Sequence, residues 1–159
     1  MLDSDRLYCR IRKEWIAATP EEFVRQRVLH HMIEDRGFPA ELVAVEKSLR
    51  QMPHLGSVDR KTIPDRRADI VCFAKNSVMM GGELYPILTV ECKAVKLNSG
   101  VISQVVGYNY VVRACFVAIV NQEEIRTGWY DSTRGEYVFI NHLPQFHELV
   151  QFIKNKGVV

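Results

Sequence analysis

Two acidic residues and a lysine stand at places in the chain where a charge is unexpected. Asp69 interrupts an otherwise apolar segment, and Glu91 and Lys93 directly follow another. An ionised side chain inside an apolar strand is costly unless it is paired or binds a cation. In a strand, Glu91 and Lys93 point to the same side and Cys92 points to the other. We therefore expect an acid and an amine to be neighbours on one sheet face.

Pairing of the two strands would bring the carboxylates of Asp69 and Glu91 together beside Lys93. Oxygen ligands of this kind suit Mg²⁺, and Mn²⁺ can take the same ligands. We predict a metal site formed by Asp69, Glu91 and the backbone carbonyl of Cys92. Such a site can activate water and stabilise charge on a phosphate, with Lys93 as the catalytic cation. Without metal, we expect the two carboxylates to repel each other, with only Lys93 to offset them.

Further polar residues are candidates for a supporting role. Gln104 and Tyr108 lie one helical turn apart, where an amide and a phenol can orient phosphate or water, so we group them with the catalytic residues. Glu22 is a tentative metal ligand. Gln26, one turn after Glu22, and Arg67, two residues before Asp69, are candidates for binding a nucleic-acid backbone, Gln26 tentatively.

Each of these residues also has a purely structural explanation. Glu91 and Lys93 could form an ion pair on a sheet face and perform no chemistry. Tyr108 could pack in the core, Arg67 could solvate a strand end, and Glu22 could be the capping-box glutamate of a helix whose N-cap is Thr19. The five histidines lack ligand spacing and are expected at the surface or as caps.

Apolar periodicity and turn residues predict the elements that position these side chains. The helix after Thr19 starts with Pro20 and stops at Gly37 and Pro39. The segment 51–66 is polar and is expected to be a long loop, and 76–82 is expected to turn the chain. The expected strands are 42–49, 68–74, 84–93, 114–120, 128–130 and 136–140, and two further helices are expected at 99–112 and 144–154. This order predicts an α/β (α+β) fold with a mixed central sheet flanked by helices.

Composition narrows the class of protein. The chain has 159 residues, of which 47% are hydrophobic and 25% are charged, as in ordinary soluble proteins. This length predicts a single domain over residues 1–159. Apolar runs are too short to span a membrane and no signal peptide is apparent, so we expect a cytoplasmic protein. Four scattered cysteines predict reduced thiols, and a net charge of +2 leaves the partner open.

Five motifs in order resemble a known nuclease domain. They are Thr19-Pro20-Glu21-Glu22-Phe23-Val24-Arg25-Gln26, Val45-Glu46, Arg67-Ala68-Asp69-Ile70-Val71, Val90-Glu91-Cys92-Lys93-Ala94 and Gln104-x-x-x-Tyr108-Asn109. The set resembles the N-terminal, PD-(D/E)XK-type domain of type I restriction enzyme R subunits and places the nuclease core at residues 20–155. The resemblance implies a restriction-endonuclease-like fold, Mg²⁺-dependent cleavage of DNA, and acids on the second and third core strands.

The chain departs from that family in two ways. Ala68 replaces the motif proline, and the insertion at 51–66 is longer than expected. Nothing in these residues encodes a helicase motor, so complete ATP-driven restriction is excluded for this chain alone. The expected partners are DNA and either other restriction-modification subunits or further copies of the chain. The alternative is a non-catalytic DNA-binding or assembly module that retains the nuclease fold.

Overall fold

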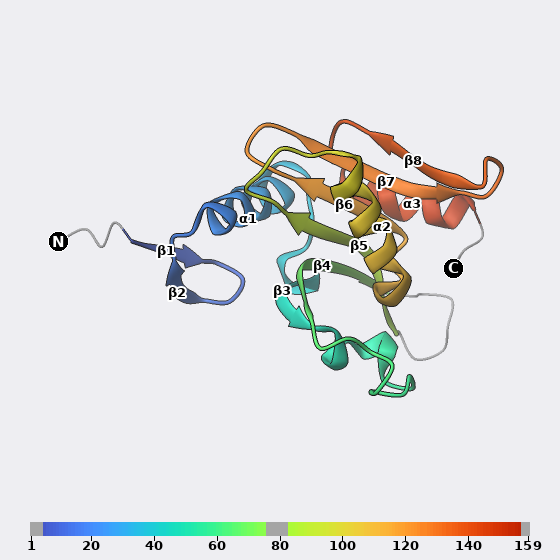
Figure 1. Cartoon of the computed structure of the whole chain (residues 1–159), viewed down its shortest axis with the longest axis horizontal. Coiled ribbons are helices and arrows are strands. Elements are labelled where there is room, and N and C mark those ends of the chain that lie inside the picture. Colours follow the sequence, from blue (N-terminus) through green and yellow to red (C-terminus); the bar gives the residue numbers. More distant parts are fainter. Residues whose placement is uncertain (1–4, 76–82, 157–159) are drawn as a thin grey trace.

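A six-stranded mixed sheet is the centre of the structure, a computed structural model that describes residues 5–75 and 83–156 (Figure 1). Its strand order is β3-β4-β5-β6-β7-β8, so each strand pairs with its neighbour in sequence. Only β5 and β6 run parallel, and all other pairs in this sheet are antiparallel. The strands are β3 (Val43–Ser48), β4 (Arg67–Lys75), β5 (Leu84–Cys92), β6 (Phe116–Val120), β7 (Ile125–Asp131) and β8 (Glu136–Ile140).

The parallel pair of β5 and β6 is explained by its sequence and by its connection. Parallel strands need a crossover, which the helix α2 (Ser99–Val112) supplies. Both strands are apolar on both faces, as expected for strands covered by helices on each side. Every residue of β6 is buried, with Ala118 and Val120 in one core cluster and Val117 and Ile119 in another.

The helices cover the two faces of the sheet. The helices α1 (Pro20–His30) and α3 (Phe146–Asn155) contribute Val24, Val28, Leu149 and Ile153 to the larger core cluster, together with alternate residues of β4, β5 and β6. On the other face, Val105 of α2 packs against β6. The structure thus confirms the predicted α+β fold with a mixed sheet flanked by helices.

The start and end of α1 follow the predicted signals. The side chain of Thr19 accepts a hydrogen bond of 3.1 Å from the backbone N–H of Glu22, which satisfies one of the free donors of the first turn. The helix continues as a short π-helical turn over His31–Asp35, and Gly37 then adopts a φ of 68°, a left-handed conformation that glycine favours.

From α1 onward the element order matches the prediction, but three features differ. A two-stranded hairpin of β1 (Arg6–Cys9) and β2 (Glu14–Ala17) precedes α1 and was not predicted. The strand β7 begins earlier than expected, at Ile125. The segment 49–66 is not only a polar loop, because it buries Leu49, Met52, Leu55 and Ile63 in a hydrophobic cluster against β4. The expected turn at Asn76–Gly82 lies outside the described residues.

Candidate active site

The two predicted acids lie at the same end of two adjacent strands. In the antiparallel pair of β4 and β5, Ile70 is opposite Val90, and Asp69 and Glu91 are the residues next to this pair on the two strands. The side chains of Asp69 and Glu91 are 13% and 10% exposed, so both carboxylates are largely removed from water. The expected convergence of the two carboxylates on one cation stays a prediction.

Two cationic side chains contact the same oxygen of Glu91. The Lys93 Nζ donates to Glu91 Oε1 at 2.8 Å, as the alternation of the strand predicts. The Arg66 Nη2 lies 3.3 Å from the same oxygen. A catalytic role for Lys93 and a structural ion pair would both produce this geometry, so the contact alone does not assign the role.

Asp69 is held by a backbone group and an arginine. Its Oδ2 accepts a hydrogen bond of 2.7 Å from the N–H of Cys92, and its Oδ1 accepts one of 2.9 Å from Arg25 Nη2. The expectation that Lys93 alone offsets the two acids is therefore wrong. Arg25 and Arg66 also neutralise them, because the fold brings both guanidinium groups to the carboxylates.

Arg25 connects the acids of three elements. It is nearly buried, and it pairs with Glu22 one turn earlier, with Glu21 at 3.3 Å and with Glu46 at 2.9 Å, in addition to Asp69. Burial alone lowers the pKa of an arginine, but the carboxylates of Asp69, Glu22 and Glu46 together raise the pKa of Arg25 above its usual value. Arg25 therefore remains charged and serves as the common counter-ion.

Glu46 owes its position to an unusual backbone conformation. Within β3 its φ is 53°, and the regular pairing of Val45 with Ile70 and of Lys47 with Ala68 skips it. Residues with longer side chains rarely adopt this left-handed region, and such strain concentrates at functional sites. The conformation allows the Glu46 carboxylate to reach Arg25.

Glu22 does not face the site as an open ligand. Its carboxylate is 8% exposed and binds Arg12 at 2.6 Å and Gln26 at 2.8 Å, as well as Arg25. Gln26, a tentative DNA-binding residue, is thus occupied by Glu22. Glu21, the residue before Glu22, is the more accessible acid. Burial, followed by repulsion from Asp69, raises the pKa of Glu21.

The residues predicted on α2 are only partly brought into the site. The Tyr108 hydroxyl donates to the backbone carbonyl of Arg67 at 3.2 Å, and its ring lies under the guanidinium of Arg66, 4.1 Å from the ring centroid. Burial raises the pKa of Tyr108 to about 12, so the phenol is a hydrogen-bond donor at neutral pH. Gln104, one turn earlier, is exposed and makes no hydrogen bond within the described part of the chain.

Cys92 contributes through its backbone. Its N–H binds Asp69, as described, and its thiol lies on the opposite, buried side. Burial, with repulsion from Asp69, raises the pKa of the Cys92 thiol well above its usual value, so the sulfur stays protonated and inert.

A polar cleft lies beside Arg66, the arginine that contacts Glu91, although none of the predicted catalytic residues lines it. It has a volume of about 530 Å³ and is lined by Glu46, Ser48, Gln51, Asp65, Arg66 and Arg67. Arg67, predicted to bind a nucleic-acid backbone, thus lies in this cleft beside Arg66.

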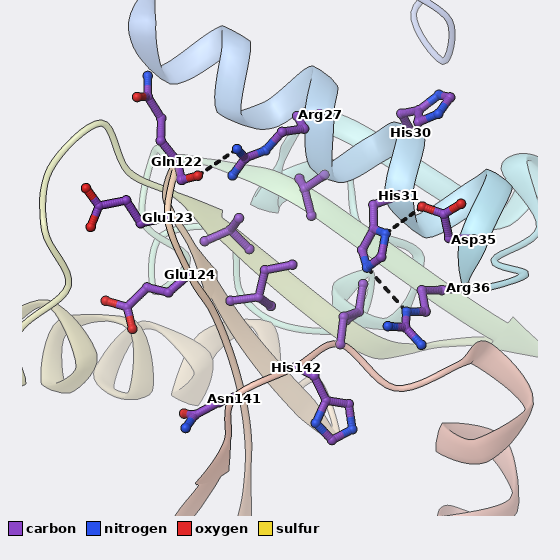
Figure 2. A pocket seen from close by; sticks show the side chains of 14 residues that line it. Arg27, His30, His31, Asp35, Arg36, Gln122, Glu123, Glu124, Asn141 and His142 are labelled. Atoms are coloured by element: carbon purple, nitrogen blue, oxygen red, sulfur yellow. Dashed lines mark hydrogen bonds and ion pairs between the residues drawn. The ribbon is translucent and has the colours of Figure 1, made fainter.

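A second cavity of about 530 Å³ opens between the end of α1, the turn before β7 and the segment before α3 (Figure 2). In it, His31 accepts from Arg36 Nε at 3.2 Å through Nε2 and binds Asp35 at 2.7 Å through Nδ1. Arg27 donates to the carbonyl of Gln122 and so ties α1 to that turn. This cavity is lined neither by the predicted catalytic residues nor by Arg25 or Arg66, which contact Asp69 and Glu91, so it is separate from the site described above.

Two further properties hold for the residues that the structure describes. No group of three or more His, Cys, Asp or Glu side chains among them is arranged to hold a metal ion. No described helix is long and apolar enough to cross a membrane.

Sequence reasoning missed four charged residues of this site: Glu21, Arg25, Glu46 and Arg66. Arg25 lies three and four residues after Glu22 and Glu21, a helical spacing that indicates ion pairs and could have revealed it. Glu46 stands in one of the quoted motifs but was given no role there, and the partners of Glu46 and Arg66 are distant in sequence, so these contacts depend on the fold.

The mixed six-stranded sheet flanked by helices is consistent with a nuclease-like fold. Residues 20–144 match the family described as type I restriction enzyme R protein N terminus. The chain belongs to this family, which indicates a nuclease of the restriction type as its functional class. No curated protein and no solved structure gave a significant match.

Proposed function

We propose that the chain is a Mg²⁺-dependent endonuclease domain that hydrolyses DNA phosphodiester bonds. The observation that carries the proposal is the position of Asp69 and Glu91 at the same end of two adjacent strands, with Lys93 at 2.8 Å from Glu91, in a chain of the restriction enzyme family. Asp69 and Glu91 are the proposed metal ligands and Lys93 the catalytic cation. Tyr108, whose hydroxyl donates to the backbone carbonyl of Arg67, supports the site from α2, and Gln104 is the proposed supporting residue one turn earlier.

The donor set suits a magnesium ion. Mg²⁺ is commonly bound by one or two carboxylates, with water and substrate phosphate completing its coordination, so a third acidic side chain is not required. Each ionised carboxylate offers about four lone-pair sites, and the hydrogen bonds to Asp69 and Glu91 leave some of these free. When bound, the ion supplies Lewis-acid stabilisation and an activated water.

The protein groups have defined tasks in this proposal. The Cys92 N–H and the Arg25 guanidinium each bind one oxygen of Asp69 and so fix the orientation of its carboxylate. Lys93, 22% exposed, can turn from Glu91 towards a non-bridging phosphate oxygen once Glu91 shares its charge with a cation. DNA is the proposed substrate, and other restriction-modification subunits or further copies of the chain are the proposed partners.

One observation favours a second candidate function. Asp69 and Glu91 already have cationic partners, which would suffice for a stable, non-catalytic fold that only binds DNA or assembles with other subunits. In that case the charges are structural ion pairs and no metal is needed.

Nicking of supercoiled plasmid DNA separates the two candidates. We expect conversion to open circles by the wild-type chain with Mg²⁺ or Mn²⁺, and none after addition of EDTA. Glu91→Gln, which retains volume, should abolish nicking, whereas Glu136→Gln at the exposed start of β8 should not. Absence of metal-dependent nicking in the wild type, with DNA binding retained, would favour the non-catalytic module.

A further inference from the structure

Arg66 occupies a distinctive place beside the candidate active site. It directly precedes β4, its guanidinium lies over the ring of Tyr108 at 4.1 Å, and its Nη2 is 3.3 Å from Glu91 Oε1. The aromatic face favours a flat arrangement of the guanidinium group and thereby fixes its plane. The side chain is nevertheless 40% exposed, so one edge of the group faces solvent.

Glu91 does not require Arg66 for neutralisation. The same oxygen receives the closer Lys93 ammonium at 2.8 Å, and the contact with Arg66 is the longer of the two. A guanidinium group has five N–H donors, and its contact with Glu91 uses one of them. Arg66 therefore keeps donors, in a fixed plane, for a second anion.

The cleft beside Arg66 fits such an anion. Arg66 and Arg67 line it together with the polar side chains of Ser48 and Gln51. Its two acids do not oppose an anion strongly: Glu46 is paired with Arg25 at 2.9 Å, and Asp65 is 84% exposed and lies 3.8 Å from Arg50. A tetrahedral phosphate matches the fork of an arginine, which can bind two of its oxygens at once.

We propose that Arg66 is a substrate-binding residue that contacts a backbone phosphate of DNA in this cleft, with Tyr108 as the platform that orients it. The proposal rests on the proposed function for the identity of the ligand, a phosphodiester backbone. It assigns Arg66 the task of aligning the strand so that the neighbouring phosphate meets Asp69, Glu91 and Lys93. The ring of Tyr108 then positions Arg66, and its hydroxyl holds the start of β4 through Arg67.

The competing explanation is that Arg66 is only a counter-ion of Glu91. The two roles differ in a measurable quantity, the dependence of DNA affinity on salt. Loss of one phosphate contact reduces the slope of log K against log salt by about one, whereas loss of an internal ion pair leaves that slope unchanged.

The experiment compares Arg66→Ala, Arg66→Lys and the control Arg134→Ala. Arg134 is an exposed arginine also paired with an acid, Asp131 at 3.9 Å. It lies in the turn between β7 and β8. The candidate site is near the other end of β7, where Ile125 pairs with Val120 of β6. Binding to a fluorescent DNA duplex is measured by anisotropy between about 50 and 200 mM salt, with Ca²⁺ in place of Mg²⁺ to prevent cleavage.

We expect Arg66→Ala to weaken binding roughly tenfold and to lower the salt slope by about one. Arg66→Lys should keep the slope and recover part of the affinity, because it retains the charge but not the planar fork. Arg134→Ala should match the wild type. An unchanged slope in Arg66→Ala, whatever its affinity, or a wild type that does not bind DNA, overturns the proposal.

The same variants separate this proposal from the proposed function. If the wild type fails to nick plasmid DNA but its salt slope depends on Arg66, the nuclease assignment fails and the phosphate contact stands. If the wild type nicks and Arg66→Ala leaves the slope unchanged, the phosphate contact fails and the nuclease assignment stands. A folded Arg66→Ala variant is verified by circular dichroism, and Arg66→Lys supplies the test if it does not fold.

Discussion

The carboxylate of Asp69 accepts a hydrogen bond of 2.7 Å from the backbone N–H of Cys92, the residue that directly follows Glu91. The acid of β4 is thus fixed to the backbone of β5 as well as to the side chain of Arg25. A backbone donor to an ionised carboxylate is among the stronger hydrogen bonds of proteins. The separation of the two acids is therefore set by the sheet itself, which is the kind of support that a preorganised site needs.

Removal of the lysine amine tests the proposed chemistry most directly. We expect Lys93→Ala to reduce plasmid nicking by at least about 100-fold, because the amine is proposed to stabilise charge on the phosphate. Its fold should persist, since Arg66 still neutralises Glu91. The matched control is Lys75→Ala, an exposed lysine at the opposite end of β4 from Asp69. Unchanged nicking by Lys93→Ala would contradict the role of the lysine.

Metal binding should be visible as stabilisation. We expect Mg²⁺ to raise the melting temperature of the wild type, because a ligand at about 100 times its Kd adds roughly 2.7 kcal/mol to the free energy of unfolding. Asp69→Asn should remove most of this response. It should also lower the melting temperature without metal, since Asp69 binds Arg25 and the Cys92 N–H.

Repulsion between two unpaired acids would instead predict that Asp69→Asn raises the melting temperature without metal. The metal-free comparison therefore distinguishes repelling acids from paired ones. The control is Asp59→Asn, an exposed acid in the long loop after β3. A thermal-shift series of the wild type and both variants, with and without Mg²⁺, gives both quantities. A wild type that ignores Mg²⁺ and Mn²⁺ would exclude the metal site.

Sequence patterns predicted the elements from α1 to α3. They also indicated Asp69, Glu91 and Lys93 as candidate site residues, because charges within or directly after apolar strands are unusual. The structure brings Glu91 and Lys93 into contact, while the convergence of Asp69 with them and the chemical roles of all three stay predictions. The hairpin of β1 and β2 escaped because strands of four residues carry too little periodicity to detect. Arg25 escaped as a partner of Asp69 because 44 residues separate them and only the packed fold joins them.

The Arg25 cluster should be a determinant of stability. We expect Arg25→Met, which retains the length of the side chain, to lower the free energy of unfolding by about 3–5 kcal/mol, because it leaves buried carboxylates without their counter-ion. Arg10→Met, at an exposed ion pair with Glu34, should change it by no more than about 1 kcal/mol. Urea unfolding measures both. Equal stability of the two variants would mean that the acids around Arg25 are protonated or solvated.

His54 links the long loop to α2 and should make stability depend on pH. Its Nε2 lies 2.7 Å from the backbone carbonyl of Val112 at the end of α2, so this nitrogen carries the proton. Its Nδ1 is buried and has no hydrogen-bond partner among the described residues. Burial lowers the pKa of His54 below its usual value of 6.5, and the bond to Val112 only partly opposes this shift.

The sign of the effect follows from that direction. Because the pKa is lower in the folded state than in the unfolded state, the contribution of His54 to stability is present above the unfolded pKa of 6.5. It is lost as the pH falls through the folded pKa, since the unfolded chain then binds the proton more readily.

His54→Gln places an amide nitrogen at a similar reach, so it can keep the bond to Val112 but cannot titrate. We expect the free energy of unfolding of His54→Gln, relative to that of the wild type, to increase as the pH is lowered from about 8 to 5. His147→Gln, at an exposed position of α3, should run parallel to the wild type. Urea unfolding across this pH range measures the differences, and a His54→Gln curve parallel to that of the wild type would show that His54 does not titrate on unfolding.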